Sequence, residues 1–270
     1  MAVGLDCGLG AVVLVIPAYN EARAIGDVVE RCLALTDRIV VVDDGSTDDT
    51  WTVVSRYPVD ALRHPVNRGK AAALLTGIGR ALDGGAARIV TLDADGQHRP
   101  EDVPLLLAAA DHAPAAIVIG SRRADGRHAP RARYWANRIA DFWISWAAGQ
   151  LIEDTQSGFR LYPARGLRRL LAKVGSRRGF AFESEILIEA GRAGVPILPV
   201  AIPALYGTTL RASHFRPFRD IPKIVVMVGW KLLSFGMFPT GLWRILFGRA
   251  GRPLEARSPR PGPSGHAAVD

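Results

Sequence analysis

The chain has 270 residues, 49% of them hydrophobic, and carries a formal net charge of +8. A chain of this size and apolar content can bury one large core, so we expect most of it to form a single α/β domain. Its two cysteines, Cys7 and Cys32, show no pairing pattern. This excludes a disulfide framework and favours a reducing compartment, and residues 1–10 lack the basic start of a secretory signal.

Short apolar runs alternate with helical patterns along the N-terminal half. We predict strands at residues 12–16, 39–42, 89–92 and 116–119, and helices at residues 25–34, 69–82 and 100–110. Strands that alternate with helices favour a single, mostly parallel sheet flanked by helices. The sequence shows no internal repeat.

Polar residues follow each predicted strand at its carboxyl end. They are residues 19–21, 43–44, 93–95 and 120–122. Ligands of parallel sheets bind beyond the carboxyl ends of the strands, so these four segments predict one binding site.

Two carboxylates stand where the strand at residues 89–92 should end. In an extended backbone, residues i and i+2 point the same way, so Asp93 and Asp95 can converge on one cation, with Gln97 or His98 just beyond. Mg²⁺ and Mn²⁺ accept carboxylates together with phosphate oxygens, which suits a metal-bridged diphosphate. The alternative is a solvated loop, where Asp and Gly are common.

Six motifs, taken in order, carry a resemblance to a known family. They are residues 17–21 (PAYNE), 41–46 (VVDDGS), 67–70 (NRGK), 93–98 (DADGQH), 120–122 (GSR) and 157–160 (SGFR). Over roughly residues 12–215 the chain resembles family 2 glycosyltransferases of the GT-A fold, and most closely their dolichyl-phosphate mannose synthase-like branch. The resemblance implies an inverting enzyme that moves one hexose from a GDP- or UDP-sugar to a polyprenyl phosphate, with Mg²⁺ or Mn²⁺ as cofactor.

The resemblance also assigns residues to the donor. It implies that the nucleotide sugar contacts Pro17, Tyr19, Glu21, Asp44, Lys70, Asp93, Ala94, Asp95 and Arg211, and that Asp93, Asp95 and Gln97 hold the metal. Asp43 should point away from Asp44 and cap the following turn. Lys70 at a helix start is disfavoured by the helix dipole, which favours a bound anion over a plain surface lysine.

Arginines are the candidates for binding the acceptor phosphate. Arg122 follows a strand end, and Arg131 and Arg133 lie in the next loop; Arg matches phosphate bidentately, although a solvated arginine-rich loop is the alternative. A phosphate monoester has a second pKa of about 6 and is already an anion at neutral pH, so no general base is required. The predicted catalytic residues are therefore Asp95, Arg122 and Asp154, with Asp154 in a positioning role.

Further downstream, three features have open roles. Glu183 and Glu185 should face different directions on one helix, one supporting the site and the other structural. By resemblance, the segment holding Tyr206, Arg211 and His214 is the loop that closes over the donor. Five apolar residues share one helical face, which is typical of core packing but also suits a floor for the prenyl chain: Trp135, Ile139, Phe142, Trp143 and Trp146.

The excess charge lies near the C-terminus. Residues 211–260 contain ten basic and two acidic residues, so their charge of +8 equals the net charge of the whole chain. They also enclose an apolar stretch at residues 224–247. Lys231 and Pro239 interrupt that stretch, so we predict two interfacial helices on an anionic membrane surface, at the cytoplasmic face. A core helix pair with a basic rim and a single span are the alternatives. The basic residues interleave with long aliphatics, which does not favour nucleic acid.

These patterns divide the chain into a catalytic domain at residues 1–222, membrane-interface helices at 223–250 and a disordered tail at 251–270. A nucleotide-dependent dehydrogenase would need a G-x-G-x-x-G motif after the first strand, which is absent, as is the glycine-rich basic loop of a pyrophosphorylase. A family 2 transferase with another acceptor, such as a cell-wall or exopolysaccharide glycan, and a non-catalytic lipid- or nucleotide-binding module remain as alternatives.

Overall fold

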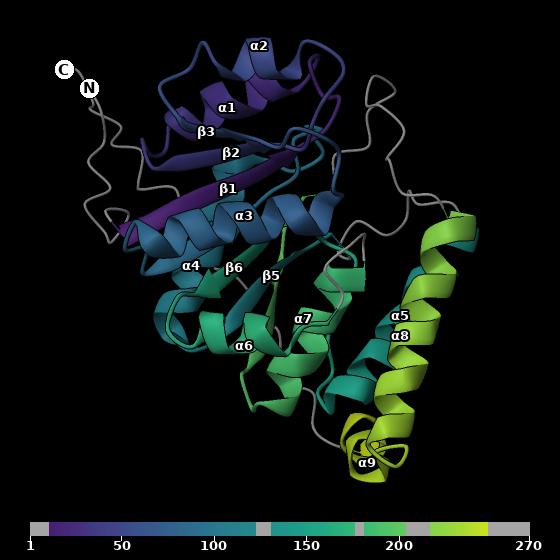
Figure 1. The fold of residues 1–270 in the computed structure, drawn as a ribbon. Helices are drawn as coiled ribbons and strands as arrows, with labels where there is room; N and C mark the ends of the chain where they lie inside the picture. Colours follow the sequence, from purple (N-terminus) through teal and green to yellow (C-terminus); the bar gives the residue numbers. More distant parts are fainter. Residues whose placement is uncertain (1–10, 123–130, 176–180, 204–216, 248–270) are drawn as a thin grey trace, which may run out of the picture.

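A computed structural model of the chain describes residues 11–122, 131–175, 181–203 and 217–247 (Figure 1). Within these residues the strands form one seven-stranded sheet of order β3-β2-β1-β4-β6-β5-β7. The strands are β1 (Val12–Ala18), β2 (Ile39–Asp43), β3 (Asp60–Arg63), β4 (Arg88–Thr91), β5 (Ile117–Ser121), β6 (Arg160–Pro163) and β7 (Ile197–Ala201). Only β6 runs antiparallel to its neighbours β4 and β5. The prediction of a single, mostly parallel sheet is confirmed.

Helices lie on both faces of this sheet. They are α1 (Ile25–Leu33), α2 (Thr50–Val54), α3 (Lys70–Asp83), α4 (Val103–His112), α5 (Arg131–Ala148), α6 (Leu167–Lys173), α7 (Ala181–Arg192), α8 (Pro217–Ser234) and α9 (Pro239–Phe247), and a 3₁₀ turn at Pro100–Asp102 precedes α4. Three strands, β3, β6 and β7, and the short helices α2 and α6 lie outside our predicted elements. β3 and β7 are edge strands, and the pattern is weak in both, because β3 is half-exposed and Pro199 interrupts β7.

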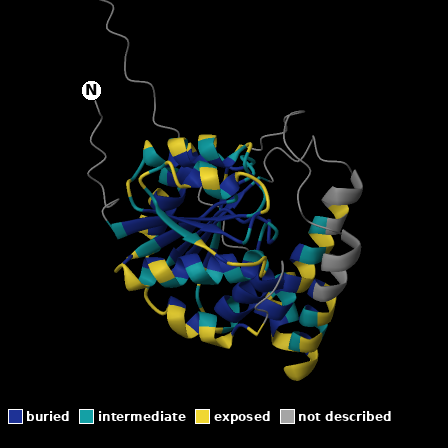
Figure 2. Cartoon of the chain, turned by 45° about the horizontal axis from the view of Figure 1, so that its top comes forward, coloured by how far each residue is buried: buried dark blue, intermediate teal, exposed yellow. Residues whose placement is uncertain are grey.

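The sheet separates two apolar cores. Alternate residues of a strand point to opposite faces, so Val13 and Val15 pack with α3, α5 and α7, whereas Leu14 and Ile16 pack with α1 and α4. Figure 2 shows the resulting band of buried strands between the helical layers. This close packing fixes the positions of the strand ends that carry the polar motifs.

β1 continues through Pro17 to Ala18, beyond the end predicted at residue 16. The Val15 carbonyl accepts a hydrogen bond from Leu92 N at 3.2 Å, so the main-chain N–H and C=O groups of the odd-numbered residues of β1 point toward β4. The pairing with β4 stops at Val15, opposite Thr91. Pro17 has no N–H to continue that ladder, and the pairing with β2 carries the strand on to Ala18, opposite Asp43.

The last helices pack beside α5 and α7. α8 buries Ile224, Val228 and Leu232, and the α8–α9 turn is held by Trp146 Nε1, which donates to the Phe238 carbonyl at 3.2 Å. Two helices with a break near Pro239 were predicted, and the structure has them, bent by 111°. In the described part of the chain, no individual helix has both the length and the apolarity to cross a membrane; only this bent pair passes that test jointly.

The apolar face of α5 differs from the expectation of core packing. Trp135, Ile139, Phe142 and Trp143 are 61%, 58%, 40% and 42% exposed. The helix instead buries smaller residues, among them Ile144 and Ala147, in the core on the side of α7. The core reading is wrong for these four residues because α5 packs through its smaller side chains against α7 and leaves the aromatic face outside.

Candidate active site

β6 brings residues 157–160 to the edge of the sheet that holds Asp93 and Asp95. β6 is antiparallel to β4, with Thr91 opposite Arg160. An antiparallel strand begins where its parallel neighbours end, so the residues before β6 lie beside the residues after β4. The Thr91 hydroxyl donates to the Gly158 carbonyl at 2.9 Å and fixes this contact.

Asp93 and Asp95 differ in their electrostatic surroundings. Burial opposes ionisation of Asp93, but the Lys70 ammonium overcomes it and holds the pKa of Asp93 at about 2. Burial and the charge of Asp93 raise the pKa of Asp95. The Gln97 backbone amide donates to Asp95 Oδ1 at 2.9 Å and holds the turn. A cation near both groups would favour the ionised form of Asp95.

Lys70 is the first residue of α3, and two carboxylates meet its ammonium. Nζ lies 2.6 Å from Asp93 Oδ1 and 3.1 Å from Glu183 Oε2. Burial opposes the charge of Lys70, but both carboxylates raise its pKa, so the side chain is a cation. We expected an anion at this position; two protein carboxylates provide it.

His98 packs against the motif of β6. Its ring stacks on Phe159 with centroids 5.5 Å apart, and the Asp93 N–H points to His98 Nδ1 at 3.5 Å. Burial lowers the pKa of His98 to about 4, so the imidazole is neutral at pH 7. Because His98 is buried, Gln97 is the better candidate for a third metal ligand.

Arg122 and Asp154 form a pair beside the aspartates. The Arg122 backbone N–H donates to Asp154 Oδ2 at 3.0 Å, and Arg122 Nε lies 3.6 Å from the same oxygen. Asp154 has φ of 51°, a left-handed conformation that Asp tolerates better than most residues. The Arg122 charge lowers the pKa of both Asp93 and Asp95, so it lies within electrostatic reach of them.

Arg160 is completely buried and organises the loop before β6. It donates to the carbonyls of Ser157 and Thr155 at 2.7 and 2.8 Å, and to that of Glu183 at 2.6 Å. Thr155 Oγ1 donates to Asp141 of α5 at 2.7 Å. The sequence marked Arg160 only as part of a motif, since a guanidinium buried among main-chain carbonyls has no local pattern of its own.

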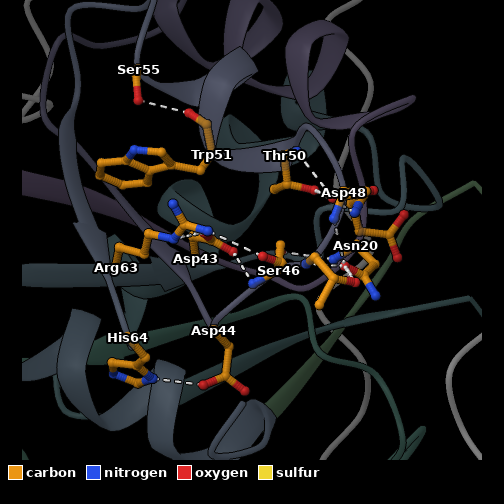
Figure 3. A network of polar contacts seen from close by, with 12 residues as sticks. Asn20, Asp43, Asp44, Ser46, Asp48, Thr50, Trp51, Ser55, Arg63 and His64 are labelled. Carbon is orange, nitrogen blue, oxygen red and sulfur yellow. Dashed lines mark hydrogen bonds and ion pairs between the residues drawn. The ribbon is translucent and has the colours of Figure 1, made fainter. Parts of the chain in front are cut away.

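The loops after β1 and β2 are tied together by side chains (Figure 3). Asn20 Oδ1 accepts from Thr47 N at 2.8 Å, and Asn20 N donates to Ser46 Oγ at 2.9 Å. Asp43 Oδ1 accepts from Ser46 N at 3.0 Å, and its other oxygen lies 3.1 Å from Arg63 Nε. Asp43 therefore caps the turn, as predicted.

Asp44 points away from Asp43, toward His64 (Figure 3). Its Oδ1 lies 2.6 Å from His64 Nδ1 and accepts from Arg68 N at 3.0 Å, while Oδ2 accepts from Gly69 N at 2.7 Å. Asp44 thus positions the loop that leads into Lys70. Its predicted contact with the nucleoside stays a prediction, and the partnership with His64 was not foreseen.

The other predicted residues fall into three groups. Pro17 is buried in β1, Glu21 is buried and Tyr19 half-buried at the sheet edge, all near the predicted nucleoside side. Ala94 is buried between the two aspartates. Arg131 and Arg133 were predicted in a loop, but they form the first turn of α5, and their side chains are outside the described structure. Tyr206, Arg211 and His214 lie wholly outside the described residues.

Residues 13–174, which include every motif described so far, match the family model described as Glycosyl transferase family 2. The chain belongs to this family. This family 2 glycosyltransferase has the GT-A fold. Its paired carboxylates, Asp93 and Asp95, lie at one edge of the sheet together with the cations Lys70 and Arg122. The family inferred from the motifs is confirmed.

Two curated relatives and one solved structure illustrate the similarity. The transferase is 30% identical over 214 residues to the UDP-N-acetylglucosamine–dolichyl-phosphate N-acetylglucosaminyltransferase of Methanococcus voltae, covering 72% of this chain and 85% of the relative. It is 30% identical over 202 residues to the polyprenol monophosphomannose synthase of Mycolicibacterium smegmatis, covering 70% and 75%. The glucosyl-3-phosphoglycerate synthase of Mycobacterium tuberculosis, solved with Mg²⁺ and UDP, is 25% identical with a TM-score of 0.57, covering 83% and 78%.

Proposed function

We propose that this glycosyltransferase moves one hexose, with inversion at the anomeric carbon, from a nucleotide-diphosphate sugar to a polyprenyl phosphate at the cytoplasmic surface of a membrane. The proposal rests on the joint presence of Arg122 at the site edge of the sheet and an exposed apolar helical surface. The names of the two curated relatives, both of which specify a lipid phosphate or its product, support it.

The exposed apolar residues carry the proposal. Of the large apolar side chains that are exposed in the described residues, all but Val66 and Leu151 lie on α5, α8, α9 or the α8–α9 turn. Trp230, Leu233 and Trp243 are 71%, 66% and 66% exposed. Soluble proteins seldom gather exposed apolar residues in this way, and the surface suits a bilayer or the chain of a lipid acceptor.

The donor side of the site fits a divalent cation shared with substrate. Among the described residues, no three His, Cys, Asp or Glu side chains gather to hold a metal ion by themselves. Asp93, Asp95 and Gln97 would therefore hold Mg²⁺ or Mn²⁺ together with diphosphate oxygens and water. When bound, the cation would offset charge on the departing diphosphate, and Lys70 and Arg211 would add to that effect.

The acceptor needs alignment more than activation. A polyprenyl phosphate is an anion at neutral pH, since its second pKa is about 6. Arg122, with Arg131 and Arg133, would bind this phosphate and aim one oxygen at the anomeric carbon. Asp154 would fix the guanidinium of Arg122, and Asp95 would act through the donor. Pro17, Tyr19, Glu21, Asp44 and Ala94 would contact the nucleotide sugar.

The membrane would be met by residues 223–250, while residues 1–222 form the catalytic domain and residues 251–270 a tail. Interfacial binding of the bent pair α8–α9 accounts for apolar side chains that remain exposed after α8 has buried Ile224, Val228 and Leu232. Lys and Arg flanking these helices would add attraction to anionic lipid of about 1 kcal/mol each.

Release of nucleoside diphosphate tests the reaction. The protein is incubated with each of several UDP- and GDP-hexoses, Mg²⁺ and undecaprenyl phosphate in mixed micelles, and the lipid product is isolated. Product that carries one hexose and requires the lipid supports the proposal, and Asp95→Asn serves as the inactive control. Equal turnover with 3-phosphoglycerate and no turnover with the lipid would overturn the acceptor assignment.

A further inference from the structure

Lys70 is shared between two carboxylates that belong to different parts of the fold. Asp93 follows β4, whereas Glu183 lies in the first turn of α7, where a helix dipole favours a negative charge. Glu183 is buried, and its carbonyl accepts from Arg160 at 2.6 Å, so its place relative to the site is fixed. The sequence predicted that one of Glu183 and Glu185 supports the site, and the contact with Lys70 favours Glu183 for that role.

The backbone of Gly158 lies directly against the contact between Lys70 and Asp93. A side chain at Gly158 would put its first carbon 2.9 Å from Asp93 Oδ2 and 3.0 Å from Lys70 Nζ, which leaves no space for it. The backbone at Gly158 therefore closes one side of the Lys70–Asp93 pair. Glu183 supplies the second carboxylate that contacts the ammonium of Lys70.

Metal binding at Asp93 sets up a competition with Lys70. A divalent cation on Asp93 repels the ammonium and takes its closest anionic partner. The Lys70 side chain is only 20% exposed, so little water can replace the contact with Asp93. Glu183 keeps a second carboxylate 3.1 Å from Nζ when a cation draws on Asp93.

We propose that Glu183 is a positioning residue that retains Lys70 in the donor site when the metal occupies Asp93, and so keeps the ammonium available to the leaving diphosphate. The inference rests on the metal-dependent donor site of the proposed function. Without Glu183, one of these two carboxylate contacts of Nζ is already lost, and metal binding at Asp93 would weaken the other. Loss of Glu183 should therefore weaken metal binding itself, before any turnover.

Mn²⁺ binding in the presence of UDP or GDP, but without a sugar donor or acceptor, tests this directly. Free Mn²⁺ is titrated by electron paramagnetic resonance against the wild type, Glu183→Gln, Lys70→Gln and the double variant. We expect the Glu183→Gln protein to bind Mn²⁺ about tenfold more weakly than the wild type, in the range seen when groups that support metal ligands are removed. In the Lys70→Gln background the same change should cost less than about threefold, since no ammonium then needs retaining.

Glu185→Gln is the matched control. It lies two residues along the same helix and is also buried, but pairs with Lys231 of α8 at 2.9 Å. Mn²⁺ affinity in this variant should stay within about threefold of wild type, and thermal melting of all variants separates a folding defect from a metal effect. Kinetics add a second readout: Glu183→Gln should lower kcat as well as metal affinity, and Glu183→Asp should restore part of both.

The outcomes separate this inference from the proposed function. Mn²⁺ affinity that is equal in wild type and Glu183→Gln, or an equal loss with and without Lys70, overturns the role of Glu183 and leaves the donor site intact. A wild-type protein that neither binds Mn²⁺ nor needs a divalent ion for turnover overturns the metal site as well.

Discussion

One carboxylate oxygen, Asp154 Oδ2, contacts Arg122 twice. It accepts a hydrogen bond from the backbone N–H of Arg122 at 3.0 Å and lies 3.6 Å from Arg122 Nε. An oxygen engaged in this way serves to orient the guanidinium. Asp154 therefore acts on the acceptor through Arg122, which agrees with an acceptor that is already an anion and needs no proton removed.

Replacement of Asp154 by Asn tests this assignment. The variant keeps the shape and one acceptor oxygen but loses the charge that holds Arg122. We expect a higher KM for polyprenyl phosphate and a pH–rate profile of unchanged shape. Loss of one limb of the profile would instead identify Asp154 as a general base.

Arg122→Ala should impair the acceptor more than the donor. A charge-assisted hydrogen bond contributes about 1.5–3 kcal/mol, so kcat/KM for the lipid should fall roughly 10- to 100-fold. Nucleotide affinity, measured by calorimetry, should change by less than about threefold. Arg122→Lys should recover little, because a point charge does not reproduce bidentate binding. Equal losses in both measurements would contradict the acceptor role.

The site was predictable from the sequence to the extent that its residues lie at strand ends. Asp93, Asp95 and Arg122 follow apolar strands, and a parallel sheet brings such ends together without further information. Glu183 and Arg160 come from a helix and from an antiparallel strand, and neither element has a pattern that fixes its place. Their approach to Asp93 depends on the insertion of β6 between β4 and β5, which is a property of the whole sheet.

The fold shows the same division between local and distant information. The buried strands β1, β2, β4 and β5 have continuous apolar runs, whereas the edge strands β3 and β7 do not. The prediction that the apolar face of α5 packs in the core was wrong for a related reason. An amphipathic pattern gives an apolar face, but only packing decides that the small residues on α5 meet the core while Trp135 and Trp143 stay exposed.

Asp44→Asn should loosen the loop that precedes Lys70. It would weaken the hydrogen bonds from the Arg68 and Gly69 amides, with an expected loss of about 1–3 kcal/mol in the free energy of unfolding. Urea denaturation measures that loss, and donor affinity should fall in parallel because Lys70 follows directly. Ser55→Ala is a control, since this exposed hydroxyl donates to Trp51 within α2 and lies outside the loop. An unaltered denaturation midpoint would contradict the proposed clamp.

His98 should make the protein sensitive to acid. Burial holds its pKa at about 4 in the folded state, below its ordinary value of about 6.5. The unfolded chain therefore binds a proton over this window and the folded chain does not, so stability is full above pH ~6.5 and falls as pH drops toward 4, by at most roughly 3 kcal/mol. Urea unfolding of EDTA-treated protein at several pH values measures the slope. His98→Gln should flatten it, and an unchanged slope in that variant would refute the assignment.

Metal dependence follows from the paired carboxylates. Asp93→Asn and Asp95→Asn should each lower kcat by at least about 100-fold, because each removes a proposed ligand of the shared cation. Excess EDTA should abolish turnover, and Mg²⁺ or Mn²⁺ should restore it. Far-ultraviolet circular dichroism should show both variants folded. Full activity in EDTA would exclude the metal role of these residues.

Membrane attachment is best tested on exposed side chains, because deletion of α8 would also uncover the core that Ile224, Val228 and Leu232 help to close. The triple variant Trp230→Ser, Leu233→Ser, Trp243→Ser removes three residues that are 66–71% exposed and should leave the fold unchanged. It should bind anionic liposomes at least about tenfold more weakly, since each buried apolar side chain contributes about 1.5–3 kcal/mol.

The matched control for that variant replaces an exposed apolar residue elsewhere. Val66→Ser changes a side chain that is 64% exposed and lies in the loop between β3 and α3. Its liposome binding should equal that of the wild type. High salt should weaken binding of the wild type in part, because screening reduces the attraction of basic flanks to anionic lipid while the apolar contacts persist. A wild-type protein that stays in the supernatant with anionic liposomes at low salt would exclude the membrane role. Protein that resists both high salt and alkaline carbonate would show that the bent pair Ile224–Ser234 and Pro239–Phe247 inserts through the bilayer and does not lie on it.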